Sequence, residues 1–293
     1  MDWQIQLISL YDMVCKYYQE SLWVYCQRFS PHCDLSFTDE EIITLYLFGI
    51  INKHTQILAI YNEADRHLRD WFPRLPSYPG FVQRLNKLDI VFAPLIEILC
   101  PNDPLLRDWL IDSAPIILAQ QGHSFKARVA PEYADKGYCA SKKLHYYGVK
   151  LHILGQRQEG SIPFPDYIGI TPASENDGKV LENLLPFLPK NLAYGDKAYN
   201  YLKPIALEQE IDLLTPVKKN KGQLYLDVSD QWLSRAVSQV RQPIESLFNW
   251  INEKTGIEKA SKVRSSSGLL VHVFGRLAAA IFMLVFPEIF CSA

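Results

Sequence analysis

The sequence predicts an α/β protein in which a mixed sheet flanked by helices follows an all-helical N-terminal region. Apolar residues recur at helical spacing through the first hundred or so positions, and strand-like runs replace them after Pro104. Helical spacing then returns between and after those strands. The segment Pro101–Pro104 begins and ends with proline. We therefore expect a domain boundary there, with one domain at residues 1–104 and a second at 105–293.

The N-terminal region is expected to be a bundle of short helices. Thr38–Glu41 has the pattern of a capping box, ahead of an apolar face that runs from Ile42 to Ile50. Thr55 is expected to cap a second helix, and three prolines separate that helix from a third that begins near Phe81. Such a bundle suits a DNA-binding module or a cap packed on the rest of the chain, and the pattern leaves both open.

After Pro104 the predicted elements follow a defined order. The interpretation is clearest at 145–153, where alternate residues from Tyr147 to Ile153 are apolar. Strands are predicted at 109–118, 145–153, 166–171, 192–194 and 211–215, and helices from 177, at 202–209, at 243–253 and at 268–286. Three strands followed by helix, strand, helix, strand and helix is the order of an RNase H-like core.

Composition and charge limit the classes of function. With 48% hydrophobic and 21% charged residues the chain is an ordinary folded protein, and its net charge of −2 gives no overall signature of nucleic-acid binding. The charge is segregated, however. Between Lys126 and Lys150 the sequence has six Lys and Arg residues but only two acidic ones. Three lysines lie within Lys218–Lys221. These segments are the expected contacts with an anionic partner.

Nothing in the sequence indicates export or a membrane. No basic-then-apolar run opens the chain, and the apolar stretch Leu277–Phe286 is too short to cross a bilayer. The six cysteines lack paired CxxC spacing, which suits a reducing compartment. We expect a cytoplasmic, nucleoid-associated protein with no membrane partner.

Three acidic residues are the candidates for a catalytic metal site, if the fold brings them together. Asp112 and Asp196 each follow a short apolar run of strand type, and Glu245 opens a helical stretch. A lone aspartate after a strand is more often a turn or a helix cap, but three carboxylates in this element order favour a site. Together they can hold two divalent cations about 3.5–4 Å apart, which activate water and stabilise both oxygens of an in-line displacement at phosphorus. Mg²⁺ prefers such oxygen ligands, and Mn²⁺ is expected to substitute.

Basic residues around the carboxylates are the expected DNA contacts. Arg241 precedes Glu245 by four positions and shares its helical face if the helix begins before Pro243. Lys150 and His152 lie on the polar face of their strand, where a solvated side chain is the alternative. Asp177 is expected to cap its helix and not to bind metal. The expected contacts with DNA are Lys142, Lys143, Lys150, His152, Lys197, Lys218, Lys219, Arg241, Lys254 and Arg264.

Several segments together resemble the insertion-sequence transposases of the DDE class, and their order and spacing are specific. An upstream segment, Trp71–Tyr78, also resembles the helical N-terminal region of these proteins. The matching segments are Leu110–Ser113, Gly137–Lys143, Tyr147–His152, Thr171–Asp177, Tyr194–Tyr199 and Arg241–Glu245.

The resemblance implies an RNase H-like catalytic domain in which Asp112, Asp196 and Glu245 form the DDE triad with two Mg²⁺ ions. It implies cleavage at the terminal inverted repeats of the element, strand transfer into target DNA and a homodimeric active complex. Residues 1–104 would recognise the DNA ends. Many relatives carry Tyr and Lys where this chain has Ser238 and Asn252, and Lys254 is the nearby lysine.

Two other functions remain open at this point. The same fold could serve a structure-specific nuclease or resolvase that joins no strands. A domesticated DNA-binding protein could keep the scaffold without catalysis, although three close carboxylates repel one another when no metal is bound.

Overall fold

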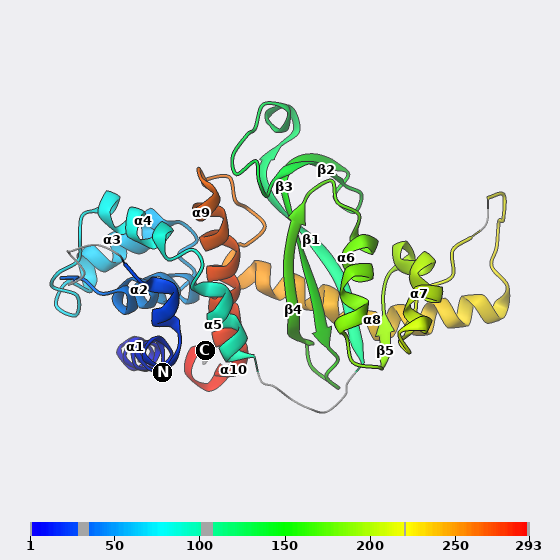
Figure 1. The fold of residues 1–293 in the computed structure, drawn as a ribbon, viewed down its shortest axis with the longest axis horizontal. Helices are drawn as coiled ribbons and strands as arrows, with labels where there is room; N and C mark the ends of the chain where they lie inside the picture. Colours follow the sequence, from blue (N-terminus) through cyan, green and yellow to red (C-terminus); the bar gives the residue numbers. More distant parts are fainter. Residues whose placement is uncertain (1, 29–34, 101–107, 220, 292–293) are drawn as a thin grey trace. The chain divides into compact units, whose positions relative to one another are not determined.

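The computed structural model describes residues 2–28, 35–100, 108–219 and 221–291 (Figure 1). The chain forms two compact units, which we call the helical unit (Met1–Pro101 with Ile251–Ala293) and the sheet unit (Asn102–Trp250). The boundary expected at Pro101–Pro104 lies outside the described residues. The second division, after Trp250, was not predicted, because the sequence assigned all residues from 105 to 293 to one domain.

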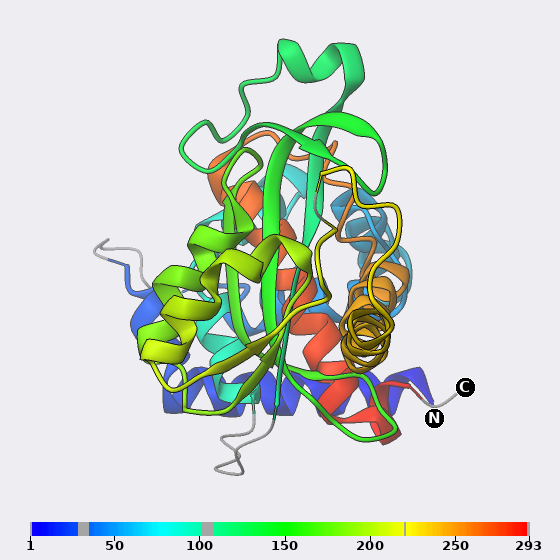
Figure 2. The same cartoon turned by 90° about the vertical axis from the view of Figure 1, so that its right-hand side faces the viewer.

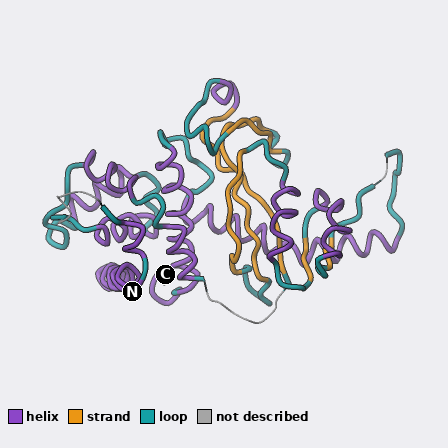
Figure 3. The backbone as a smooth tube through the Cα atoms, viewed as in Figure 1, coloured by secondary structure: helices purple, strands orange, loops and turns teal. Residues whose placement is uncertain are grey.

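The helical unit combines N-terminal helices with the C-terminal end of the chain, and the described part of it contains helices and loops only (Figure 3). Helix α10 packs on α2 and α5 and is apolar almost all round, which is the composition of a helix buried in a core. The main helices are α1 (Trp3–Glu20), α2 (Asp39–Ile51), α3 (Ile57–His67), α4 (Tyr78–Lys87), α5 (Phe92–Leu99), α9 (Ser266–Leu270), α10 (Arg276–Val285) and α11 (Pro287–Phe290).

The capping box at the start of α2 is confirmed. The Thr38 hydroxyl accepts from the Glu41 N–H at 3.3 Å, and the Thr38 N–H donates to the Glu41 carboxylate at 2.6 Å. The prediction that Thr55 caps the next helix is wrong, because α3 begins after Gln56. The Thr55 carbonyl instead accepts from the buried guanidinium of Arg276, which also donates to the carbonyl of Thr255. A buried arginine thus satisfies backbone acceptors from distant parts of the sequence.

One described helical run, the 20 residues Ser266–Val285, is long and apolar enough to span a membrane, with a mean hydropathy of 2.0 in its most apolar 18-residue window. Its most apolar window is 72% buried inside the protein, as in the core helix of a folded domain. The run is longer than the apolar stretch Leu277–Phe286 that the sequence indicated, because α9 and a π-helical turn, Val271–Gly275, continue into α10.

The sheet unit is built on a curled, mixed six-stranded sheet. β1 pairs antiparallel with β3 along one edge of β3, while β2 and β4 share its other edge. β5 and β6 continue the sheet on the far side of β1 as parallel strands. The strands are β1 (Trp109–Gln120), β2 (Asp135–Cys139), β3 (Leu144–Gln156), β4 (Phe164–Pro172), β5 (Leu192–Tyr194) and β6 (Asp212–Leu214).

Helices cover both faces of this sheet, with α6 (Asp177–Leu184) and α7 (Lys203–Glu208) on one side and α8 (Val228–Thr255) on the other (Figure 2). The α6 face carries the apolar core, which includes Ile111, Leu154, Leu181 and Leu213. On the α8 face, Ile244 of α8 packs against the backbone at Gly155 of β3.

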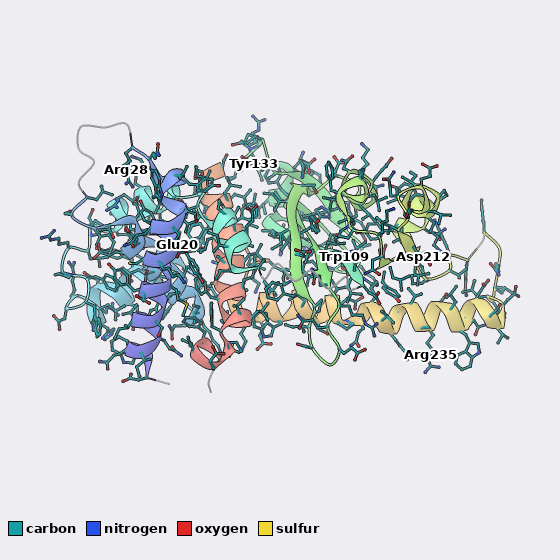
Figure 4. The ribbon with its side chains drawn as sticks, turned by 60° about the horizontal axis from the view of Figure 1, so that its bottom comes forward. Glu20, Arg28, Trp109, Tyr133, Asp212 and Arg235 are labelled. Carbon is teal, nitrogen blue, oxygen red and sulfur yellow. The ribbon has the colours of Figure 1, made fainter. Side chains whose placement is uncertain are left out.

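Helix α8 is much longer than the predicted 243–253. Pro243 lies inside it, and the helix continues through the proline. Arg241 is therefore helical and lies one turn before Glu245, which settles the alternative left open by the sequence. Most residues in the first half of α8 are exposed, and Figure 4 shows Arg235 on its solvent side.

Candidate active site

Strand register places Asp112 and Asp196 at the same level on neighbouring strands. Leu110 of β1 pairs in parallel with Tyr194 of β5, and each aspartate lies two residues beyond its paired position. β5 ends at Tyr194, so Asp196 lies at a strand end as predicted, whereas β1 continues to Gln120 and Asp112 lies inside its strand. Two carboxylates from separate segments thus come to one part of the sheet.

Asp112 is mostly buried and has a partner on each carboxylate oxygen. Its Oδ1 accepts from the Ser113 N–H at 2.8 Å, and its Oδ2 accepts from Arg241 Nη1 at 2.8 Å. Burial raises the pKa of the Asp112 carboxyl above its ordinary value, with a smaller contribution in the same direction from the charge of Asp196. The Arg241 guanidinium and the Ser113 N–H oppose that shift and favour the charged form.

Arg241 joins two of the three predicted catalytic residues. Its Nη1 contacts Asp112, and its Nη2 donates to Oε1 of Glu245 one helical turn away. The Arg241 side chain is only 15% exposed, and burial alone would lower its pKa. The carboxylates of Asp112, Glu245 and Asp196 outweigh that effect, so the pKa of Arg241 is raised and its charge is held.

Asp196 lies two residues beyond the end of β5. Its Oδ1 accepts from the Ala198 N–H at 2.6 Å and caps a short 3₁₀ helix, Lys197–Leu202. Gly195 precedes it because a Cβ there would lie 2.8 Å from the ring of buried Tyr199. The charge of Asp196 acts on both Asp112 and Arg241. Arg241 thus contacts two of the carboxylates, Asp112 and Glu245, and is influenced by the charge of the third.

The donor set matches a hard divalent cation in its chemistry, since all three residues offer carboxylate oxygens. Asp112, Asp196 and Glu245 are the residues that would hold such an ion. In the part of the chain that the structure describes, however, no three His, Cys, Asp or Glu side chains stand close enough together to bind a metal. The positive charge among the carboxylates is supplied by Arg241.

A second polar group lies on the opposite face of the sheet. Asp177 accepts from Lys150 Nζ at 2.9 Å and from the Ser113 hydroxyl at 3.1 Å. Lys150 also donates to the carbonyl of Glu175 at 2.6 Å. The prediction that Asp177 caps its helix is wrong, because the side chain of Asn176 caps α6 by accepting from the Gly178 N–H.

His152 belongs to this second group. It pairs with Ser113 across the sheet, and its Nε2 lies 2.7 Å from the Thr171 hydroxyl. Burial lowers the pKa of His152 to about 4, so the imidazole is neutral at physiological pH. His152 and Lys150 thus lie on the α6 face and have protein partners, whereas Asp112 points to the α8 face. Lys150 and His152 have Glu175, Asp177 and Thr171 as partners, and their contact with DNA phosphate stays a prediction.

The other predicted DNA contacts are distributed over both units. Lys197 follows Asp196 directly and is exposed. Lys142 and Lys143 lie in the exposed turn between β2 and β3, and Lys218 and Lys219 lie in the exposed segment after β6. Lys254, in the last turn of α8, and Arg264 belong to the helical unit. Of this predicted set, Arg241 contacts Asp112 and Glu245, and Lys197 follows Asp196 in the chain.

Two residues of the site were missed by the sequence interpretation. Ser113 orients Asp112 through its N–H and contacts Asp177 through its hydroxyl. Tyr199 is buried beneath Gly195, and burial raises its pKa well above the ordinary value. The signal for both was their position, since each stands one to three residues after a predicted catalytic aspartate.

Comparison with known protein families gives a significant match. The family model described as "Transposase DDE domain" matches residues 108–282, which is more than half of the chain. No curated protein and no solved structure matches the chain significantly.

Proposed function

Because the chain belongs to the transposase DDE domain family, we propose that it is an insertion-sequence transposase that cleaves DNA at the ends of its element and joins them to target DNA. The observation that carries this proposal is that Arg241 of α8 links Asp112 to Glu245, while Asp112 and Asp196 each lie two residues beyond a paired position of β1 and β5. Antiparallel first strands followed by parallel later strands, with helices on both faces, support an RNase H-like architecture for the sheet unit.

The chemistry follows from what these side chains can hold. Bound divalent cations, Mg²⁺ or Mn²⁺, would activate the attacking oxygen and stabilise the charge that develops on the phosphodiester. Asp112, Asp196 and Glu245 supply the oxygen ligands, and the Ser113 N–H fixes the orientation of the Asp112 carboxylate. Lys197 and Arg241 supply positive charge for DNA phosphates at the same place.

Cleavage and joining are both in-line attacks at phosphorus, first by water and then by the freed 3′ hydroxyl, so one site can serve both steps. We also propose that the helical unit contributes to recognition of the inverted repeats at the element ends. The active complex would pair two ends in a homodimer, in the cytoplasm with the nucleoid DNA. The exposed lysines at 142, 143, 218 and 219 are the remaining candidates for backbone contacts.

The test is strand cleavage by the purified protein on DNA that carries the ends flanking its coding region. Asp112→Asn, Asp196→Asn and Glu245→Gln should each reduce cleavage by at least about 100-fold, the order of loss when a charge-stabilising group is removed from an active site. Binding of the DNA ends should change little. Asp212→Asn, an exposed carboxylate of the same unit, is the matched control and should keep full activity.

Two outcomes would change the assignment. Full cleavage by any one of the three variants would remove that residue from the site. Cleavage without strand transfer would support a structure-specific nuclease, and end binding without cleavage under Mg²⁺ or Mn²⁺ would support a DNA-binding protein that has lost catalysis.

A further inference from the structure

Arg241 engages the carboxylate oxygens that a divalent cation needs. Asp112 has one oxygen bound to the Ser113 N–H and the other to Arg241 Nη1, both at 2.8 Å. Glu245 has its Oε1 bound to Arg241 Nη2. A cation that binds Asp112 and Glu245 together must therefore displace at least part of the guanidinium.

The surroundings make this contact strong. The Arg241 side chain is 15% exposed and that of Asp112 25% exposed, so water screens the pair only partly. The guanidinium matches carboxylates with a planar fork of donors, and here its two terminal nitrogens serve two different carboxylates. The charge of Asp196 adds to the attraction. Without this arginine, three carboxylates would repel one another across the site.

On the proposed substrate, a DNA phosphate can compete with the carboxylates for the guanidinium of Arg241. Phosphate oxygens accept the same fork of N–H donors as a carboxylate does. The neighbouring Lys197 is exposed next to Asp196 and can bind the same backbone. When the guanidinium turns to a phosphate, one oxygen of Asp112 and one of Glu245 become available to a cation.

We propose that Arg241 is an internal counterion that holds Asp112 and Glu245 in place and keeps divalent cations off them until DNA binds. The proposal rests on the proposed function, because it concerns the same carboxylates. Binding of DNA and binding of the cation then assist each other, and by linkage each raises the affinity for the other by the same factor. Arg241 is a positioning residue on this account, and its effect is visible without any turnover.

The test is Mn²⁺ binding at pH 7.5, followed by the electron paramagnetic resonance of the free ion, with and without end DNA. For the wild-type protein, DNA should raise the Mn²⁺ affinity by about tenfold or more, within the usual range of coupling between sites. Arg241→Gln, which removes the charge, should bind Mn²⁺ without DNA about as tightly as the wild type does with DNA. Arg235→Gln, on the exposed part of the same helix, is the matched control and should behave as wild type.

Arg241→Lys provides a second variant in case the glutamine variant does not fold. Lysine keeps the charge but has no fork, so it should release one carboxylate and give intermediate Mn²⁺ affinity without DNA. Unchanged or weaker Mn²⁺ binding by the DNA-free Arg241 variants, with Asp112→Asn abolishing the binding of the DNA complex, would overturn the counterion role and leave the active site standing. If Asp112→Asn and the wild type bind Mn²⁺ equally in the DNA complex, the proposed metal site itself fails, and the counterion role with it.

Discussion

Ser113 shows how one residue links the two faces of the sheet beside the carboxylates. Its N–H donates to Asp112 on the α8 face, and its hydroxyl donates to Asp177 on the α6 face. Lys150 fixes Asp177 from the adjacent strand. The position of the Asp112 carboxylate is thus tied to a polar group that lies outside the predicted catalytic set.

The sequence predicts three carboxylates for the candidate site, but it could not predict all of the partners that the structure gives to the residues around them. Asp112, Asp196 and Glu245 were predictable because each follows a local pattern, a strand run or a helical spacing, that appears in the chain itself. Alternation also showed that Lys150 and His152 share the polar side of β3. It could not show that α6, from a later segment, covers that side and supplies Asp177, since strand periodicity says nothing about what packs on a face.

His152 gives a prediction for stability against pH. Its pKa is lowered to about 4 in the folded protein by burial, whereas an unfolded histidine titrates near 6.5. The unfolded state therefore binds more protons below about pH 6.5, so stability falls as the pH drops from about 6.5 to 4. The loss from this residue should reach about 3 kcal/mol at the lower end.

The measurement is urea unfolding of the wild type and His152→Gln across this pH range. The variant cannot take up the proton but can keep a hydrogen bond to Thr171, so its stability should fall less between pH 6.5 and 4. Equal slopes for the two proteins would show that His152 does not titrate as described. His272, whose pKa burial lowers to about 3, adds a similar slope in both proteins and cancels in the comparison.

At the scale of elements, the helices and strands that were predicted best are those with a local signal in the sequence, such as a capping box or a clear alternation. The capping box of α2 and the alternation of β3 are local, and both elements are found where they were expected. β2 was missed because Asp135–Cys139 contains no fully buried residue and has a glycine at its centre. It forms a strand through pairing with β3, which is a tertiary contact. The start of α8 was missed because Pro243 is a usual stop signal.

The sheet has no room for a side chain at Gly148 of β3. A Cβ there would lie 2.0 Å from the carbonyl oxygen of Ile116 in β1, where the pairing of β1 and β3 is irregular. Gly148→Ala must therefore push backbone apart and should destabilise the protein by about 1–3 kcal/mol. Chemical denaturation measures the change.

Gly169→Ala is the control for that substitution. Gly169 is also a strand glycine, but a Cβ there meets nothing within 4 Å. Its replacement by alanine should be neutral, or should stabilise the protein by about 0.4–1 kcal/mol because alanine lowers the conformational entropy of the unfolded chain. Equal losses of unfolding free energy in Gly148→Ala and Gly169→Ala would show that the close approach of β1 does not explain the cost of a side chain at Gly148.

At the scale of the whole molecule, the division into units differs from the division expected from the sequence. Residues 251–293 complete the helical unit, although the family match at 108–282 extends well into them. The sequence could not show this, because an apolar helix such as α10 looks the same whichever core it fills. The hydroxyl of Tyr46 in α2 donates to the carbonyl of Val271, a contact between residues far apart in the chain.

This division predicts how fragments behave. Residues 1–104 alone lack α10, which packs on α2 and α5, so the fragment should expose a large apolar surface and fail to unfold cooperatively. Addition of residues 251–293 as a separate chain should restore a cooperative transition, followed by circular dichroism. A cooperative transition for 1–104 alone would show that the N-terminal helices form a domain without the C-terminal segment.

The most direct test of the central claim, that Asp112, Asp196 and Glu245 form a divalent-cation site for DNA cleavage, is the anomalous scattering of Mn²⁺ in crystals of the protein bound to its end DNA. The account predicts two Mn²⁺ peaks next to these three carboxylates, with Arg241 on a DNA phosphate. It is contradicted if Mn²⁺ is absent from these carboxylates in the DNA complex, or if it binds elsewhere at the scissile phosphate.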